Sequence, residues 1–338
     1  MRWACLAVFV VCTVAASLDV DNFDFYAARA KKKNFKRLSP SENAKLQLIC
    51  GQQKPKSEPR VHKERLMIDS GTFAKQSSIP WAASLSHTKD HNNFCGATLI
   101  SSRHLISAAH CFYDYASSYL PCRGPKTKKK VCQMRISLGG VCLHKNPDLG
   151  CNDVDVQRIR IAKFAVSKKF NEQKCMHGND LAIIELAEDV KLDNTTFPVC
   201  LPPAVSSKEN LNQTLQRLNE LYSFGFGRMG SEQINRLKFF HSHFSSEHFD
   251  QEDGQSDLIN AVADEQPNER QPRICPGDSG GGLLGKEIKT GRVSLVGVHS
   301  YASECDENQK DSRAYASTFI GLHLNVICAI TGVCRKSL

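Results

Sequence analysis

The feature that most limits the possible folds is a series of short apolar runs that starts near Ile68. The runs are four to six residues long and lie at residues 81–85, 97–100, 105–109, 181–186, 293–298 and 314–318. Short runs separated by turns, without helical patterns between them, are typical of strands in a β-barrel or β-sandwich. Residues 319–329 instead space their apolar side chains as on one face of a helix. The pattern predicts an all-β domain that ends in a helix.

The chain begins with the pattern of a secretory signal. Arg2 precedes thirteen largely apolar residues, 4–16, and the small residues Ala15, Ala16 and Ser17 offer a cleavage site. This run is too short to span a bilayer, and no later stretch approaches about 18 consecutive apolar residues. We therefore expect a secreted, extracellular protein without a membrane span, with residues 1–17 removed.

The fifteen cysteines agree with an oxidising compartment. Cys5 and Cys12 lie in the signal segment, so thirteen remain, and the odd number leaves one thiol free or paired with another molecule. Asn194 and Asn212 begin glycosylation acceptor patterns, which also suit secretion. No Cys-x-x-Cys pair occurs, which argues against a metal-binding protein built on His and Cys.

The positive charge is concentrated near the N-terminus. Residues 18–67 carry twelve Lys/Arg and six Asp/Glu, whereas the net charge of the whole chain is +9. A nucleic-acid-binding protein concentrates charge on its folded domain, so nucleic acid is not an expected partner. We interpret residues 18–67 as a flexible, solvated segment, with a polyanion-binding arm as the alternative. Within it, residues 38–42 have the pattern of a helix start, and Gly51 is expected to end that helix.

Two regions interrupt the pattern of short strands. Residues 112–152 contain four cysteines and a basic run, which favours a disulfide-stapled surface loop, with a binding exosite as the alternative. Residues 243–272 are acidic and poor in large apolar side chains. This composition predicts a mobile loop.

Three motifs carry residues suited to acyl transfer. Ser279 lies in Cys-Pro-Gly-Asp-Ser-Gly-Gly-Gly, His110 ends an apolar run, and Asp180 begins another. The glycines permit a tight turn in which the N–H groups of Gly277 and Ser279 can converge on one oxygen. Each motif alone also occurs in ordinary turns and strand ends. Together they supply the nucleophile, the base and the orienting carboxylate that acyl transfer requires.

In their chain order, His110, Asp180 and Ser279, the three motifs resemble the chymotrypsin/trypsin-type serine endopeptidases, from about Ile68 to the C-terminal helix. The resemblance implies two six-stranded antiparallel β-barrels with a C-terminal helix, and peptide-bond hydrolysis without cofactor or metal. Ser279 would be the nucleophile, His110 the general base and Asp180 its orienting partner. Gly277 and Ser279 would form the oxyanion hole.

The resemblance extends to disulfides and supporting residues. It implies that Ser300 supports Asp180, and it implies three disulfides: Cys95–Cys111, Cys275–Cys305 and Cys50–Cys200. Residues 38–51 also resemble the lead-in of a nematode group of trypsin-like proteins.

By the same resemblance, the protein would be made as a zymogen. Its parts would be a signal peptide (1–17), a pro-segment (18–67) and a protease domain (68–338). Cleavage after Met67 would free the ammonium of Ile68 to pair with Asp278. Since Met67 stands where the family usually has Arg or Lys, the activating protease would be non-tryptic.

The substrate pocket departs from the family pattern. Arg273 occupies the position of the pocket-floor aspartate of trypsin, Arg313 that of a wall glycine, and Ala302 that of another glycine. Arginines would reject basic side chains and could bind an acidic residue before the scissile bond (P1) of a protein or peptide substrate. In the alternative, the arginines fill the pocket or point away from it. The protein would then be a catalytically silent homologue that binds partners, with residues 112–152 as the contact surface.

Overall fold

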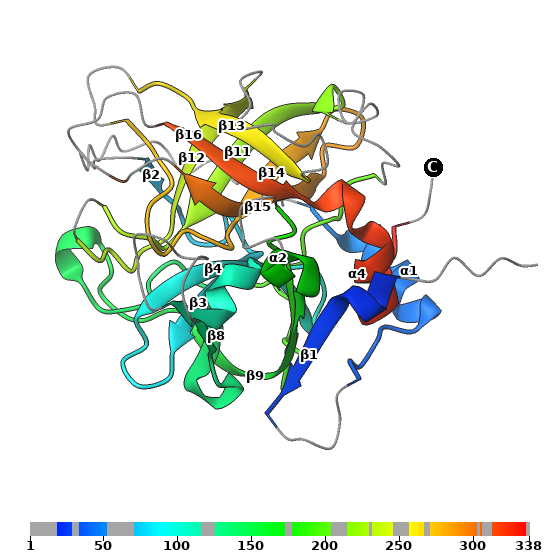
Figure 1. Cartoon of the computed structure of the whole chain (residues 1–338). Coiled ribbons are helices and arrows are strands. Elements are labelled where there is room, and N and C mark those ends of the chain that lie inside the picture. The colour runs from blue at the N-terminus through cyan, green and yellow to red at the C-terminus, as the bar shows by residue number, and fades with distance from the viewer. Residues whose placement is uncertain are drawn as a thin grey trace, which may run out of the picture.

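A computed structural model of the chain shows two β-barrels stacked one above the other (Figure 1). Met67, Ile68, Asn212 and the expected signal peptide lie outside the described residues. Among the described residues, no helix is long and apolar enough to cross a membrane. The structure describes residues 19–28, 34–52, 71–115, 126–172, 178–203, 215–229, 232–245, 257–266, 271–302, 305 and 313–335.

The first barrel is a closed antiparallel sheet of six strands. In sheet order these strands run β9-β10-β5-β4-β3-β8, and pairing of β8 with β9 closes the ring. Alternate side chains point into the barrel, which is filled by large side chains with no exposed surface, among them Trp81, Leu85, Phe112 and Phe164. The strands are β3 (Ala82–His87), β4 (Asn93–Leu99), β5 (His104–Ser107), β8 (Met134–Leu138), β9 (Gln157–Ser167) and β10 (Ala182–Leu186).

The second barrel has the same construction. Its order is β11-β14-β15-β16-β13-β12, with β11 pairing to β12, and the short β2 (Thr72–Phe73) extends it beside β12. The two closed barrels confirm the predicted fold class. The strands are β11 (Leu218–Gly225), β12 (Lys238–Phe244), β13 (Leu258–Ala263), β14 (Gly282–Glu287), β15 (Val293–Ala302) and β16 (Ala314–Phe319).

The C-terminal helix begins later than its apolar pattern predicts. A 3-10 turn, η6 (Ile320–Leu322), follows β16, and α4 (Leu324–Thr331) ends at Gly332 in a left-handed conformation. Further short elements connect the barrels' strands: η2 (Ala109–Phe112), β6 (Tyr113–Tyr115), β7 (Lys126–Lys128), η3 (Val131–Gln133), η4 (Pro147–Leu149) and α2 (Lys168–Glu172).

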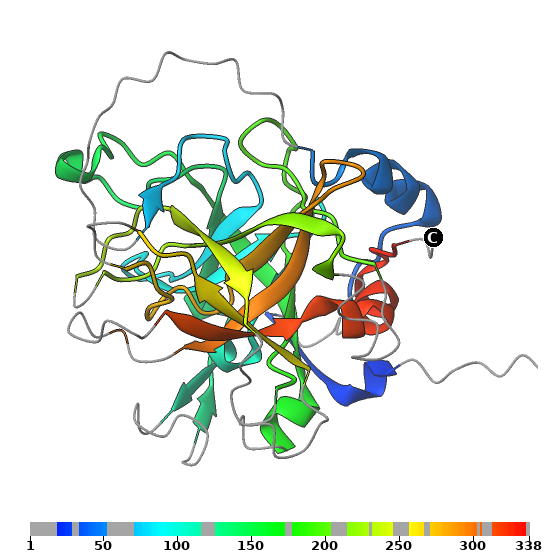
Figure 2. The same cartoon turned by 90° about the horizontal axis from the view of Figure 1, so that it is seen from above.

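The N-terminal segment is part of the folded core, so the interpretation of residues 18–67 as flexible and solvated is wrong for residues 19–28 and 34–52. After η1 (Asp19–Asn22), β1 (Phe23–Ala27) pairs with β9 and becomes a seventh strand on the first sheet. The helix α1 (Pro40–Ile49) lies beside α4 in both views (Figures 1 and 2). Buried side chains from this segment are Phe23, Phe35, Leu38 and Leu46.

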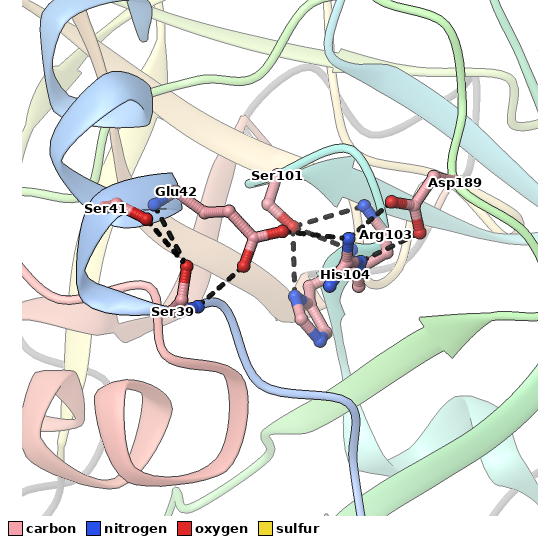
Figure 3. A network of polar contacts seen from close by, with 7 residues as sticks. All are labelled: Ser39, Ser41, Glu42, Ser101, Arg103, His104 and Asp189. Atoms are coloured by element: carbon pink, nitrogen blue, oxygen red, sulfur yellow. Dashed lines mark hydrogen bonds and ion pairs between the residues drawn. The ribbon is translucent and has the colours of Figure 1, made fainter.

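The predicted start of α1 is confirmed, and side-chain contacts connect this end of the helix to the first barrel. Ser39 and Glu42 form a capping box, in which the Ser39 side chain accepts from the Glu42 N–H at 3.2 Å. Arg103 is buried and donates to Glu42 Oε1 at 3.2 Å and to Asp189 Oδ1 at 2.8 Å (Figure 3). The disulfide Cys50–Cys200 lies at the other end of the helix.

Two predicted loops contain barrel strands. The strand β8 lies within residues 112–152, and β13 lies within residues 243–272, so neither region is wholly a surface or mobile loop. These two strands were not predicted because cysteines and charged residues surround their short apolar runs in the sequence. A disulfide does staple part of the first region, at Cys142–Cys151, whereas Cys132 is an exposed free cysteine.

We expect the free energy of unfolding to fall as the pH is lowered below about 6. Burial lowers the pKa of both His104 and His299 to about 3. Such a histidine contributes its full stability above the unfolded-state pKa near 6.5. That stability is lost as the pH falls toward 3, because the unfolded chain binds protons that the folded chain does not, at up to about 1.4 kcal/mol per pH unit for each histidine.

Urea unfolding at several pH values between 7 and 4 measures this dependence. Protonation of carboxylates also lowers the free energy of unfolding at acidic pH, so the wild-type protein is compared with His104→Gln. The free energy of unfolding of this variant should fall less steeply as the pH is lowered. Equal slopes for the two proteins would contradict the prediction.

Candidate active site

The pairing of β5 with β10 brings His110 and Asp180 together. Ala182 lies opposite Ser107, so the residues after β5 and before β10 meet at the same edge of the barrel. The Asp180 carboxylate accepts two hydrogen bonds from His110, from Nδ1 to Oδ2 at 2.7 Å and from the backbone N–H to Oδ1 at 2.9 Å. Because an ionised carboxylate only accepts, Nδ1 carries the hydrogen and Nε2 keeps its lone pair.

Two residues of the second barrel also hold Asp180 in place. Ser300 Oγ donates to Asp180 Oδ2 at 2.6 Å, and Thr318 Oγ1 donates to the Asp180 backbone oxygen at 3.3 Å. The aspartate side chain is buried and accepts three hydrogen bonds, from His110 Nδ1, the His110 backbone N–H and Ser300 Oγ. The carboxylate can therefore orient His110 and stabilise a positive charge on its ring.

Ser279 lies on a tight turn that packs against the first barrel. Gly277 has φ 96° and Gly280 has φ 79°, and a Cβ on Gly280 would lie 2.4 Å from Ser107 Oγ. Only glycine permits this approach. The Ser279 backbone oxygen accepts from the Gly96 N–H at 2.7 Å, which joins the turn to β4.

The Cys95–Cys111 disulfide is a common neighbour of the histidine and the serine turn. Cys111 Sγ lies 3.8 Å from His110 Nε2 and 3.7 Å from the Ser279 backbone oxygen. Atoms of Cys95, His110 and Cys111 lie within 4.8 Å of one another, which is metal-site spacing. Both sulfurs are consumed by the disulfide, however, and a disulfide offers no thiolate to a metal.

Hydrogen bonds to buried groups hold the segment before Ser279 in place. Asn93 Nδ2 donates to the Gly277 backbone oxygen at 2.9 Å. The buried Asp278 accepts from the N–H groups of Gly227 at 2.7 Å and Cys275 at 3.0 Å. A Cβ on Gly227 would lie 2.5 Å from this carboxylate, so the absence of a side chain there makes room for it.

A buried lysine shares this environment. Burial raises the pKa of Asp278, and the charge of Lys238 acts in the opposite direction. Burial likewise lowers the pKa of Lys238, against the attraction of Asp278, while its Nζ donates to the Arg228 backbone oxygen at 3.1 Å. The pairing expected between Ile68 and Asp278 stays a prediction, since Ile68 lies outside the described residues.

The expected pocket residues lie on three neighbouring segments. Arg273 is largely buried and donates from Nε to the Gln271 backbone oxygen at 3.5 Å. Arg313 precedes β16 and donates to the Ala263 backbone oxygen at 3.2 Å, and Ala302 lies at the end of β15, opposite Tyr315. Cys275–Cys305 is present as a disulfide close to Arg273 in sequence. The expected glycosylation residue Asn194 is exposed in a turn.

Sequence reasoning missed Asn93, Lys238, Asp257 and His323. Alternation along β12 would have placed Lys238 on the inward face, where a lysine needs a charged partner. Asn93 lies two residues before Cys95, yet nothing in the local pattern shows that it reaches Gly277. Asp257 binds the backbone of Asn179, and His323 binds Asp257, from distant parts of the chain, so no local signal indicates these contacts.

Comparison with known proteins agrees with this architecture. Mannan-binding lectin serine protease 1 of Mus musculus is 26% identical over 84% of this chain and 37% of its own length. Transmembrane protease serine 11A of Homo sapiens is 26% identical over 79% of this chain and 56% of its own. Trypsin-like protease try-5 of Caenorhabditis elegans is 24% identical over 67% of this chain and 74% of its own.

The chain thus spans about a third to a half of the length of the first two of these relatives. The family model described as Trypsin matches residues 68–320, which is most of the chain. The chain therefore belongs to the Trypsin family.

Proposed function

We propose that the chain is a secreted serine endopeptidase that uses Ser279, His110 and Asp180 to hydrolyse peptide bonds. The observation that carries this proposal is the double hydrogen bond between His110 and Asp180. It leaves His110 Nε2 next to Cys111 Sγ, which also lies 3.7 Å from the Ser279 backbone oxygen. Family membership supports the same class of reaction. The substrate would be a protein or peptide.

The geometry supports a two-step mechanism. Ser279 Oγ attacks the scissile carbonyl while His110 Nε2 takes its proton, and Asp180 stabilises the imidazolium that forms. The N–H groups of Gly277 and Ser279 would bind the oxyanion, and one such donor contributes roughly 2.7–4 kcal/mol in other enzymes. His110 then gives the proton to the leaving amine, and a water molecule releases the acyl group by the reverse sequence.

Covalent labelling of the processed protein with a fluorophosphonate tests this proposal. The reagent should react at Ser279, and Ser279→Ala should abolish labelling. A folded, correctly processed protein that is not labelled would favour the second candidate, a catalytically silent homologue that acts as a secreted binding protein.

Activation is proposed to occur by a cut after Met67, made by a non-tryptic protease. N-terminal sequencing of the active form should then give Ile68 as one of its N-termini. The segment with α1 should remain attached through Cys50–Cys200 and separate only on a reducing gel. An active form in which no chain begins at Ile68 would refute this route.

The specificity proposed for this endopeptidase is an acidic P1 residue, bound by Arg273 with Arg313 nearby. The support is the position of Arg273, two residues before Cys275 and largely buried. A guanidinium in such a site matches a carboxylate in charge and shape.

A further inference from the structure

A largely buried, hydrogen-bonded pair of side chains lies near the proposed triad, outside the roles assigned above. Asp257 directly precedes β13, and His323 lies between η6 and α4. Their side chains are 8% and 13% exposed, and His323 Nε2 lies 2.5 Å from Asp257 Oδ2. A short hydrogen bond between two largely buried side chains holds both of them in fixed positions.

The other oxygen of Asp257 binds the turn that leads into Asp180. Oδ1 accepts from the backbone N–H of Asn179 at 2.8 Å. Asn179 has φ 56° and Gly178 has φ 84°, so both residues are in the left-handed region, which asparagine and glycine adopt most readily. A Cβ on Gly178 would lie 2.0 Å from Asp257 Oδ1, so the close approach of this carboxylate requires a glycine.

This contact crosses the boundary between the two barrels. Asn179 and Asp180 lead into β10 of the first barrel, whereas Asp257 leads into β13 of the second. The proposed triad is divided in the same way, because His110 follows β5 and Ser279 precedes β14. The relative position of the barrels therefore sets the position of His110 relative to Ser279.

The two other bonds from the second barrel to Asp180 do not act on the turn itself. Ser300 binds a side-chain oxygen and Thr318 binds the backbone oxygen of Asp180. Asp257 alone among these contacts binds the backbone before Asp180, at a point where the chain is in an unusual conformation. Its own backbone oxygen accepts from the Phe319 N–H at 2.8 Å, which fixes Asp257 to the end of β16.

We propose that Asp257 and His323 are positioning residues, which through Asn179 hold Asp180 and His110 in register with Ser279. This inference rests on the proposed function, because it concerns the same triad. A displacement of about 1 Å between reacting groups can cost about 10²-fold in rate. The pair acts on the backbone, so it leaves the carboxylate of Asp180 free for His110 and Ser300.

The test is a set of variants assayed on a peptide substrate. Asp257→Ala should lower kcat about 10- to 100-fold with KM changed less than about twofold, because orientation and not binding is lost. Asp257→Asn keeps an acceptor for Asn179, and His323→Gln keeps a donor for Asp257, so both should retain most of the kcat. His243→Ala is the matched control, since His243 forms an exposed pair with Asp264 at 2.8 Å elsewhere in the second barrel.

A second measurement separates this inference from the proposed function. The proton NMR signal of His110 Nδ1–H reports the His110–Asp180 bond whether or not the protein turns over substrate, and it should shift or broaden in Asp257→Ala. Unchanged kcat and an unchanged signal in folded Asp257→Ala would overturn the inference. If the signal changes in Asp257→Ala but the fluorophosphonate does not label Ser279 of the wild-type protein, only the proposed function is overturned.

Discussion

Replacing Asp180 with asparagine is expected to lower kcat by about 10⁴-fold at neutral pH, with little change in folding. The carboxylate accepts from both the backbone N–H and Nδ1 of His110. An amide has one acceptor oxygen. If that oxygen serves the backbone N–H, the amide NH₂ faces Nδ1, and the ring must carry its hydrogen on Nε2. Nε2 can then no longer take the proton of Ser279.

Steady-state kinetics and the rate of fluorophosphonate labelling should fall together in this variant. Ser300→Ala is the control, because it removes one bond to Asp180 and leaves both bonds to His110. Its loss should be about tenfold or less. A kcat of Asp180→Asn within tenfold of the wild type would show that this hydrogen-bond geometry does not determine the rate.

The sequence was sufficient for the parts of the molecule that depend on local motifs. The short apolar runs predicted an all-β domain, and the family resemblance implied that its strands form two barrels. The turn around Ser279 needs glycines that are visible in the sequence. His110 and Asp180 could be identified as candidates because each adjoins a short apolar run, 105–109 and 181–186. Their contact then follows from the pairing of β5 with β10.

The features that the sequence did not reveal depend on tertiary contacts. Phe23 lies in a short segment with charged neighbours, and its burial accompanies the pairing of β1 with β9, a strand more than a hundred residues away. Phe35 follows a run of lysines and packs against Phe25 and His104. The charge of Lys238 is acceptable in the interior only because Asp278 lies near it. Hydrophobic patterning describes faces of single elements, so it cannot report contacts of this kind.

The other large effect is expected at Arg273. Arg273→Gln should lower kcat/KM for substrates with Asp or Glu at P1 by about 10²–10³-fold. Removal of one member of a buried charge pair typically costs about 3–5 kcal/mol, which corresponds to rate effects of at least this size. Substrates with a neutral P1 residue should change little, because they never form the pair. A panel of peptides that differ only at P1 measures both effects.

Two further variants separate charge from shape in this pocket. Arg273→Lys keeps the positive charge but loses the planar, bidentate fork, so acidic substrates should be cleaved at an intermediate rate. Arg217→Gln removes an exposed arginine elsewhere in the second barrel and should leave the P1 profile unchanged. Preference of the wild-type protein for Arg or Lys at P1 would contradict the acidic pocket, since two like charges would then have to share a poorly solvated site. In that case the guanidinium of Arg273 must point away from the bound side chain, and the specificity must come from other residues.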